Sequence, residues 1–252
     1  MIRLNRLVVV LLIVILVTPI AGANKEAPIL DSERYFPDDI GLQWTYSGSV
    51  ADQIQRVSDY TNTAIVKGKT QKRGVPVVVF WESNQSNRGQ AESYLSKNKE
   101  GITYFGGNPT TDFETQLVPY RVIQFPIVLG KTVVQVEKRN LTYDLDIDHD
   151  GVREKADTRA EVAAVAIETV STPAGTFRDT IKFQGTMTVW ITLSRDKKRM
   201  PIVDTTTHWF AKDVGMVKQI EKLTFPEEMA GAPTGTITTE VLTEYSKPKS
   251  PA

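Results

Sequence analysis

The chain has 252 residues, with 30 basic and 30 acidic side chains and no cysteine. The even charge balance argues against non-specific nucleic-acid binding. The lack of cysteine excludes disulfide stapling, thiol nucleophiles and lipidation of a cysteine after export. Stability must therefore come from a hydrophobic core, which a chain of this length can build.

The first 23 residues have the pattern of a secretory signal peptide. Arg3 and Arg6 form a short basic region, residues 7–20 are almost entirely apolar, and Ala21-Gly22-Ala23 is a small-x-small cleavage site. The apolar run is short for a membrane span. We therefore expect cleavage before Asn24 and a periplasmic or secreted protein that is not integral to the membrane. The alternative is an uncleaved N-terminal anchor.

The first half of the mature chain contains short runs in which apolar and polar residues alternate, as in half-buried strands. Leu42, Trp44 and Tyr46 share one face of such a run. Residues 106–118 give no clear pattern, and within them residues 106–111 have the composition of a loop. Strands are predicted at residues 42–46, 75–81, 90–96 and 102–105, a strand pair at 54–66, and a linker followed by a strand within 122–138.

The second half continues the β pattern. Residues 160–170 contain enough alanine for a helix, but their β-branched side chains favour a strand. Residues 178–193 show the clearest alternation, with Trp190 on the otherwise polar face. Further strands are expected at 205–212, 216–225 and 236–245, followed by a disordered tail over 247–252.

Together these elements predict a mainly β protein with little helix. No internal repeat and no long amphipathic helix is evident in the sequence. The spacing of strands and turns favours a single, strongly curved antiparallel sheet, similar to a half-barrel, in one domain over residues 24–246.

An acidic loop at residues 144–157 has the most specific chemical pattern. Counting from Asp146, acidic side chains fall at positions 1, 3, 5, 9 and 12, with a glycine at position 6. Calcium prefers six to eight oxygen ligands, and alternating carboxylates around a tight turn can supply them. The predicted structural calcium ligands are Asp146, Asp148, Asp150, the Val152 carbonyl, Glu154 and Asp157.

Two features separate this loop from an EF-hand. Arg153 replaces the usual aliphatic residue, and Asp157 replaces the bidentate glutamate. Because strands flank the loop, it would stiffen a turn with an affinity of roughly 0.1–1 mM. The alternative is a solvated acidic turn.

The sequence offers little support for catalysis. Only two histidines are present, His149 and His208, and there is no Gly-x-Ser-x-Gly elbow. Zinc sites need clusters of histidine or cysteine, which are missing. We therefore predict a protein that is not an enzyme, with a hydrolase as the least favoured class.

Three motifs carry a family resemblance. They are Tyr35-Phe36-Pro37 with Gly41, Trp44 and Tyr46; Pro173-Ala174-Gly175-Thr176-Phe177; and Trp209-Phe210-Ala211-Lys212-Asp213-Val214-Gly215-Met216-Val217. Together they resemble exported bacterial proteins that group with the lipoprotein-localisation-factor-like (LolA/LolB-like) β-sheet proteins. The resemblance implies a curved sheet that cradles something apolar, and it carries over no catalytic residue.

Two functions follow as hypotheses. The first is a periplasmic binding or envelope-assembly protein whose sheet holds an acyl chain, a lipoprotein or an extended peptide, with no nucleic-acid partner. The second is a structural envelope adaptor whose sheet is filled by its own side chains. Candidates for the wall of a ligand groove are Trp44, Tyr46, Trp190 and Trp209.

Overall fold

A computed structural model describes residues 27–52, 57–83, 89–226 and 235–247 of the chain. The predicted signal peptide (residues 1–23) and all but the first residue of the predicted tail lie outside these ranges. Within the described ranges, no helix has both the length and the apolar character needed to cross a membrane.

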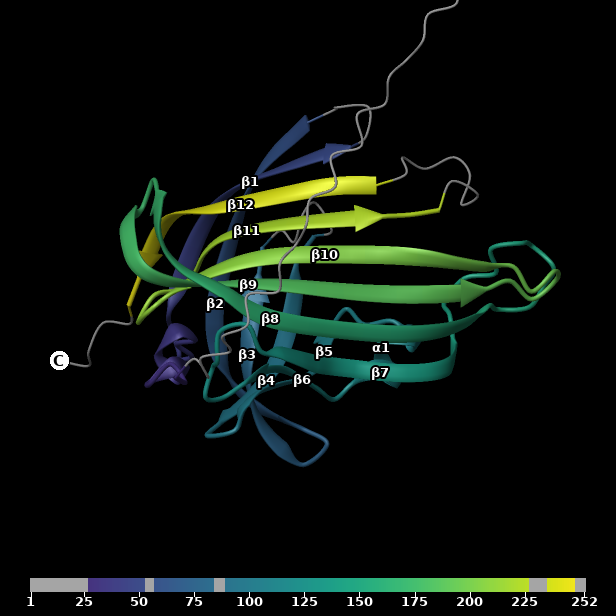
Figure 1. The fold of residues 1–252 in the computed structure, drawn as a ribbon, viewed down its shortest axis with the longest axis horizontal. Coiled ribbons are helices and arrows are strands. Elements are labelled where there is room, and N and C mark those ends of the chain that lie inside the picture. Colours follow the sequence, from purple (N-terminus) through teal and green to yellow (C-terminus); the bar gives the residue numbers. More distant parts are fainter. Residues whose placement is uncertain (1–26, 53–56, 84–88, 227–234, 248–252) are drawn as a thin grey trace, which may run out of the picture.

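One twelve-stranded antiparallel sheet forms the protein, as the alternation predicted (Figure 1). The strands of the first half are β1 (Gln43–Asp52), β2 (Val57–Lys72), β3 (Val75–Glu82), β4 (Ala91–Asn98), β5 (Gly101–Asn108) and β6 (Tyr120–Gln124). Those of the second half are β7 (Thr132–Thr142), β8 (Lys155–Thr172), β9 (Gly175–Thr192), β10 (Arg199–Ala211), β11 (Gly215–Thr224) and β12 (Gly235–Ser246).

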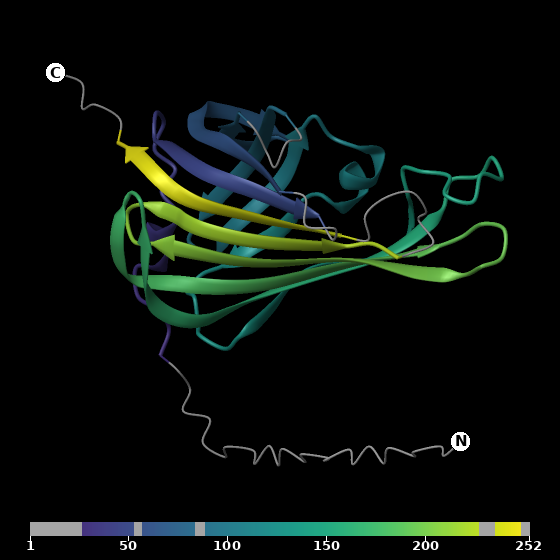
Figure 2. The ribbon, with the colours of Figure 1, turned by 90° about the horizontal axis from the view of Figure 1, so that it is seen from above.

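The strand order is β6-β5-β4-β3-β2-β1-β12-β11-β10-β9-β8-β7. Two six-stranded meanders are therefore joined side by side through the pairing of β1 with β12. Figure 2 shows the two meanders facing each other across the interior, so the sheet curls into a nearly closed barrel.

The seam of this barrel lies between β6 and β7. No backbone ladder joins these two strands in the part of the chain that the structure describes. Instead the Gln135 side-chain amide on β7 donates to the Val122 carbonyl on β6 at 2.8 Å. The connecting segment also crosses to β8, where the Gly130 amide donates to the Ala164 carbonyl at 2.7 Å. The gap between β6 and β7 is therefore bridged by a side-chain hydrogen bond and by the connecting segment, and not by backbone pairing of the two strands.

Two local predictions were wrong. Of the strand pair expected at 54–66, residues 57–66 belong to one long strand, β2, because Asn62, Ala64 and Val66 alternate onto a single buried face, and residues 54–56 lie outside the described ranges. The expected loop at 106–111 begins inside β5, which ends at Asn108, and it leads into α1 (Asp112–Leu117), whose N-cap Thr111 accepts a hydrogen bond from the Glu114 amide at 3.1 Å. A threonine three residues before a glutamate is a helix-start signal that the loop interpretation overlooked.

The ambiguous stretch 160–170 is a strand, as predicted, and it belongs to β8. Local helix propensity was overruled because β8 pairs with both β7 and β9. A short 3-10 helix, η1 (Ser32–Tyr35), precedes β1, and its neighbour Phe36 packs into the interior against Phe210 at a ring-centroid distance of 4.6 Å. The N-terminal segment is therefore part of the core.

Candidate functional site

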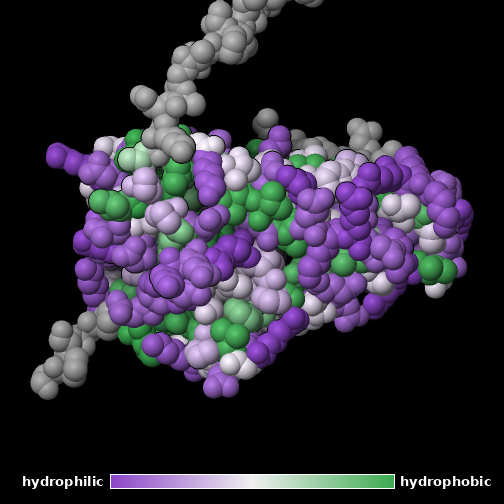
Figure 3. All heavy atoms as spheres, turned by 60° about the horizontal axis from the view of Figure 1, so that its bottom comes forward, coloured by the Kyte–Doolittle hydropathy of each residue, from purple (hydrophilic) through white to green (hydrophobic). Residues whose placement is uncertain are grey.

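An apolar cavity of about 390 Å³ lies inside the curled sheet. That volume falls in the range of small-molecule binding pockets, which are usually apolar with a few polar groups. Figure 3 shows a hollow on one face of the molecule with hydrophobic side chains at its border. The aromatic residues of the cavity wall are Phe36, Trp44, Tyr46, Phe80, Phe183 and Phe210.

The polar atoms of the two wall residues on β1 are already hydrogen-bonded. The Trp44 indole donates to the Val214 carbonyl at 2.6 Å, and the Tyr46 hydroxyl donates to the Met216 carbonyl at 3.1 Å. Both acceptors belong to the turn and strand that follow β10. Because these groups are satisfied, the rings are held in place and offer mainly carbon surface to the cavity.

The segment after η1 borders one part of the cavity. Lys97 on β4 donates to the Phe36 carbonyl at 2.8 Å and forms an ion pair with Asp38. These contacts tie the N-terminal segment to the wall of the first meander. The charge of Lys97 is therefore already compensated by an acid of the protein.

Polar side chains gather on another part of the wall. Glu82 on β3 and His208 on β10 line the cavity. Burial, reinforced by the nearby Glu240, raises the pKa of Glu82 to about 7. Burial lowers the pKa of His208 to about 4, although a hydrogen bond with Gln219 opposes that shift. At neutral pH His208 is therefore uncharged and Glu82 is close to its titration midpoint.

The four groove candidates divide between the two faces of the sheet. Trp44 and Tyr46 line the cavity, whereas Trp190 and Trp209 do not. Trp209 is sandwiched by Lys182 and Lys218 at 5.1 and 4.9 Å from its ring. Alternation explains this placement, because side chains adjacent on a strand point to opposite faces and His208 and Phe210 face the cavity.

Trp190 obeys the same rule on β9. Phe183 and Gly185 face the cavity, so an even-numbered residue of this strand faces outward. The Arg199 guanidinium lies 5.1 Å from the Trp190 ring there. Sequence reasoning missed Phe80 and Phe183 as wall residues. Phe183 lies in a run of clear alternation and Phe80 in a mostly apolar strand, but neither pattern showed which strand face would enclose a cavity.

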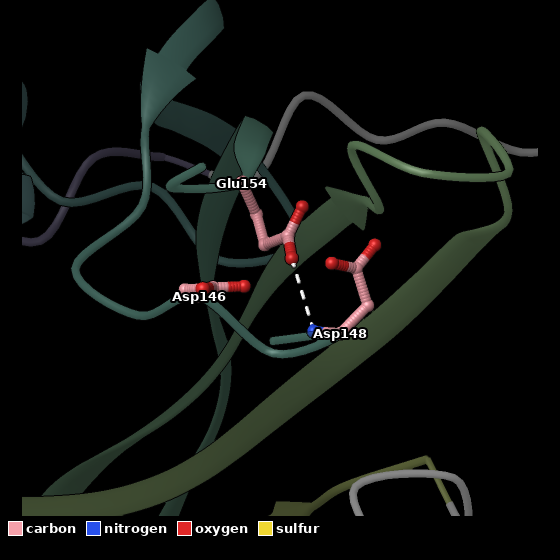
Figure 4. A group of neighbouring side chains, drawn as sticks. All are labelled: Asp146, Asp148 and Glu154. Atoms are coloured by element: carbon pink, nitrogen blue, oxygen red, sulfur yellow. Dashed lines mark hydrogen bonds between the residues drawn. The ribbon is translucent and has the colours of Figure 1, made fainter. Parts of the chain in front are cut away.

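The acidic loop brings together three of its predicted ligands. Carboxylate oxygens of Asp146, Asp148 and Glu154 lie within 4.8 Å of one another (Figure 4). Glu154 is fully buried and accepts hydrogen bonds from the amides of Ile147 at 3.0 Å, Asp148 at 3.3 Å and Ser194 at 2.7 Å. This side chain therefore joins the loop to the end of β9.

The two aspartates are arranged differently. Asp146 accepts from the amides of Asp150 at 3.2 Å and Gly151 at 2.8 Å, which closes the turn. Gly151 has a φ of 89°, a conformation that favours glycine. One oxygen of Asp148 accepts from the Arg195 amide at 3.0 Å, while the other is buried without a partner among the described residues.

The other three predicted ligands lie outside this group. Asp150 accepts from the Ser194 hydroxyl, and the Val152 side chain is exposed. Asp157 lies within β8, where it pairs with Arg199 at 3.0 Å and accepts from the Asn140 amide. Because β8 begins at Lys155, the chain is extended at Asp157 and does not wrap around the loop as an EF-hand would.

A DUF3108-like family model matches residues 157–223, which run from β8 to β11. Among curated proteins, none is significantly similar in sequence to this chain.

Three solved structures are similar. A candidate exported protein with a YmcC-like fold from Bacteroides fragilis has 16% identity and a TM-score of 0.39, covering 84% of this chain and 98% of that one. A candidate lipoprotein from Parabacteroides distasonis has 14% identity and a TM-score of 0.40, with the same coverage. A LolA superfamily protein from Nitrosomonas europaea has 10% identity and a TM-score of 0.23, covering 87% and 91%. The similar structures thus include a LolA superfamily protein.

Proposed function

We propose that this protein is an exported, non-enzymatic binding protein of the periplasm or cell surface, whose curled sheet holds an apolar chain. The observation that carries the proposal is the cavity of about 390 Å³ and its six aromatic wall residues. An apolar hollow of this size favours an apolar occupant.

The sequence suggested an acyl chain, alone or on a lipoprotein, or an extended peptide as the occupant. The cavity wall favours the acyl chain over the extended peptide. Peptides that add to a sheet bind through backbone hydrogen bonds along a free strand edge. Most strands that line the cavity, such as β3 and β10, are paired on both sides within the sheet. The edge strands β6 and β7 also contribute wall residues, but at their seam the Gln135 side chain already donates to the Val122 carbonyl. An acyl chain needs no backbone hydrogen bonds and suits a wall of side-chain carbon.

The rival adaptor hypothesis requires a core filled by the protein's own side chains. A cavity of this volume favours the binding protein, because interiors are normally packed with few voids larger than a water molecule. The third hypothesis is a hydrolase. The absence of turnover on a panel of ester, peptide and glycoside substrates would rule that hypothesis out.

The decisive experiment is mass spectrometry of the native protein after mild extraction, combined with titration of the apolar fluorophore N-phenyl-1-naphthylamine. We expect co-purifying acyl lipid and saturable fluorescence enhancement.

Met216→Trp, which fills the cavity from the wall, should weaken binding of the fluorophore at least about tenfold, equal to about 1.4 kcal/mol. Ile237→Trp, at an exposed position of β12, is the matched control. Repeated absence of lipid together with no fluorophore binding would favour the adaptor.

The acidic loop supports a separate proposal, a structural calcium ion held by Asp146, Asp148 and Glu154. The support is the convergence of three carboxylates on one another and the buried Asp148 oxygen that lacks a partner in the described part of the chain. Carboxylates are the hard oxygen ligands that calcium prefers, and water would complete a coordination of six to eight. The ion would stiffen the turn between β7 and β8.

Calorimetric titration with calcium chloride tests this site. We expect a dissociation constant of roughly 0.1–1 mM and a rise in melting temperature at saturating calcium. Asp148→Asn should abolish both effects. Asp196→Asn, in the neighbouring exposed turn, should leave both unchanged, since Asp196 lies outside the group of three carboxylates and accepts from the Lys198 amide at 2.8 Å. Equal calcium responses of the two variants would rule the site out.

A further inference from the structure

The charges that line the cavity are unevenly compensated. The lining includes three residues that carry charge in water, Asp38, Glu82 and Lys97. Lys97 is paired with Asp38 and also donates to the Phe36 carbonyl. Glu82 is therefore the carboxyl group in this wall that faces the cavity without a cation of its own.

Glu82 also lacks hydrogen-bond donors. Among the described residues, its carboxyl group has no hydrogen bond or ion pair. Glu82 is partly buried, and a carboxylate that is shielded from water without a donor or a cation is costly. Desolvation, reinforced by the nearby Glu240, raises the pKa of Glu82 to about 7.

A second acid stands behind Glu82 and adds to the negative potential. Glu240 on β12 is 2% exposed and interacts unfavourably with Glu82. Its oxygens accept from the Tyr60 hydroxyl at 2.9 Å, the Asn62 amide at 3.2 Å and the Gln219 amide at 3.0 Å. These donors are neutral, so they stabilise Glu240 without cancelling its charge.

The neighbouring polar groups do not supply a cation either. His208 is uncharged at neutral pH because burial lowers its pKa to about 4. The Tyr46 hydroxyl already donates to the Met216 carbonyl. This part of the wall thus accepts hydrogen bonds and favours positive charge, while the rest is apolar.

We propose that the cavity selects a cationic amphiphile, an apolar chain bearing an amine whose ammonium group contacts the Glu82 carboxylate. The inference rests on the proposed binding function and adds the chemistry of the ligand's polar end. An ammonium group supplies both the donors and the positive charge that Glu82 lacks. A fatty-acid carboxylate would instead bring a third acid next to Glu82 and Glu240, and like charges in contact oppose binding.

The test compares three probes with the same twelve-carbon chain, namely dodecylamine, dodecanol and dodecanoate. Each displaces N-phenyl-1-naphthylamine from the full mature protein at pH 8 and below its micelle concentration. We expect dodecylamine to bind at least about tenfold more tightly than dodecanoate, equal to about 1.4 kcal/mol, with dodecanol between them.

Glu82→Gln keeps the size of the side chain and removes its charge. In this variant the preference for dodecylamine over dodecanoate should fall to less than about threefold. Glu244→Gln, an exposed glutamate of β12, is the matched control and should keep the full preference. Circular dichroism of both variants confirms that they fold.

The outcomes separate this inference from the proposed function. If all three probes bind equally, if dodecanoate binds most tightly, or if Glu82→Gln keeps the preference, the inference is overturned while the apolar binding function stands. If none of the probes binds to the wild-type protein, the binding function itself fails.

Discussion

The acidic loop and the cavity treat buried carboxyl groups in opposite ways. In the loop, Glu154 is fully buried and accepts hydrogen bonds from three backbone amides. In the cavity, Glu82 has no partner among the described residues and its pKa is raised to about 7. The first carboxylate holds the loop together, whereas the second is the group that the proposed ligand would satisfy.

The largest effect should come from removing the structural carboxylate. Glu154→Leu leaves three backbone donors without an acceptor, and we expect a loss of at least about 3 kcal/mol in the free energy of unfolding. Glu154→Gln keeps one acceptor oxygen and should lose less. The measurement is urea denaturation, with the exposed Glu244→Leu expected to stay within about 0.5 kcal/mol of wild type. An unchanged midpoint for Glu154→Leu would remove the contrast between the two regions.

The pH dependence of stability should reveal the cavity carboxyl group. Between pH 4.5 and about 7, folded Glu82 keeps a proton that the unfolded chain has released, so stability falls as pH rises. His208 acts in the opposite sense. Between pH 6.5 and about 4 the unfolded chain binds a proton that the folded protein does not, so stability falls as pH decreases. Each effect is on the order of 3 kcal/mol, so the two largely cancel in the wild type.

Single variants separate these opposing effects. Glu82→Gln should become more stable from pH 4.5 to 6.5 and then level off, whereas His208→Gln should become less stable from pH 4.5 to 7. The free energy of unfolding measured by urea at four pH values between 4.5 and 7.5 checks both. If the free energy of unfolding depends on pH in the same way in both variants as in the wild type, the two groups do not have shifted pKa values, because water solvates them inside the cavity.

The smallest effect concerns the donors that hold Glu240. Tyr60→Phe removes the hydroxyl that donates to Glu240 at 2.9 Å and should cost about 1 kcal/mol at pH 7.5. The loss should shrink at lower pH, because a protonated Glu240 needs that donor less. Thr205→Ser, on the outer face of β10, is a conservative control. A loss that is independent of pH would point to packing of the ring over Gly48 rather than to the hydrogen bond.

Much of the fold could be predicted from local patterns. The alternation over residues 178–193 indicated the long strand β9, and the β-branched residues of 160–170 indicated a strand despite their alanine content. Asp146 and Gly151 indicated the turn between β7 and β8, since an aspartate that accepts turn amides and a glycine at positive φ are local features. The position of Asp157 depended on more than its neighbours along the chain, because it is held in β8 by pairing with β9.

What the sequence determined by itself was therefore the mainly β class, most of the strands and the acidic turn, all of which depend on neighbours along the chain. Only the tertiary structure decided which face of each strand encloses the cavity, so Trp44 and Tyr46 line it while Trp190 and Trp209 lie on the opposite face of the sheet, where Trp209 is buried. It also brought Glu82 of β3 near Glu240 of β12. Alternation along a strand predicts only that adjacent side chains point to opposite faces. Which face lies inside is set by the curl of the whole sheet, which includes register shifts at Thr45/Tyr46 and Trp209/Phe210.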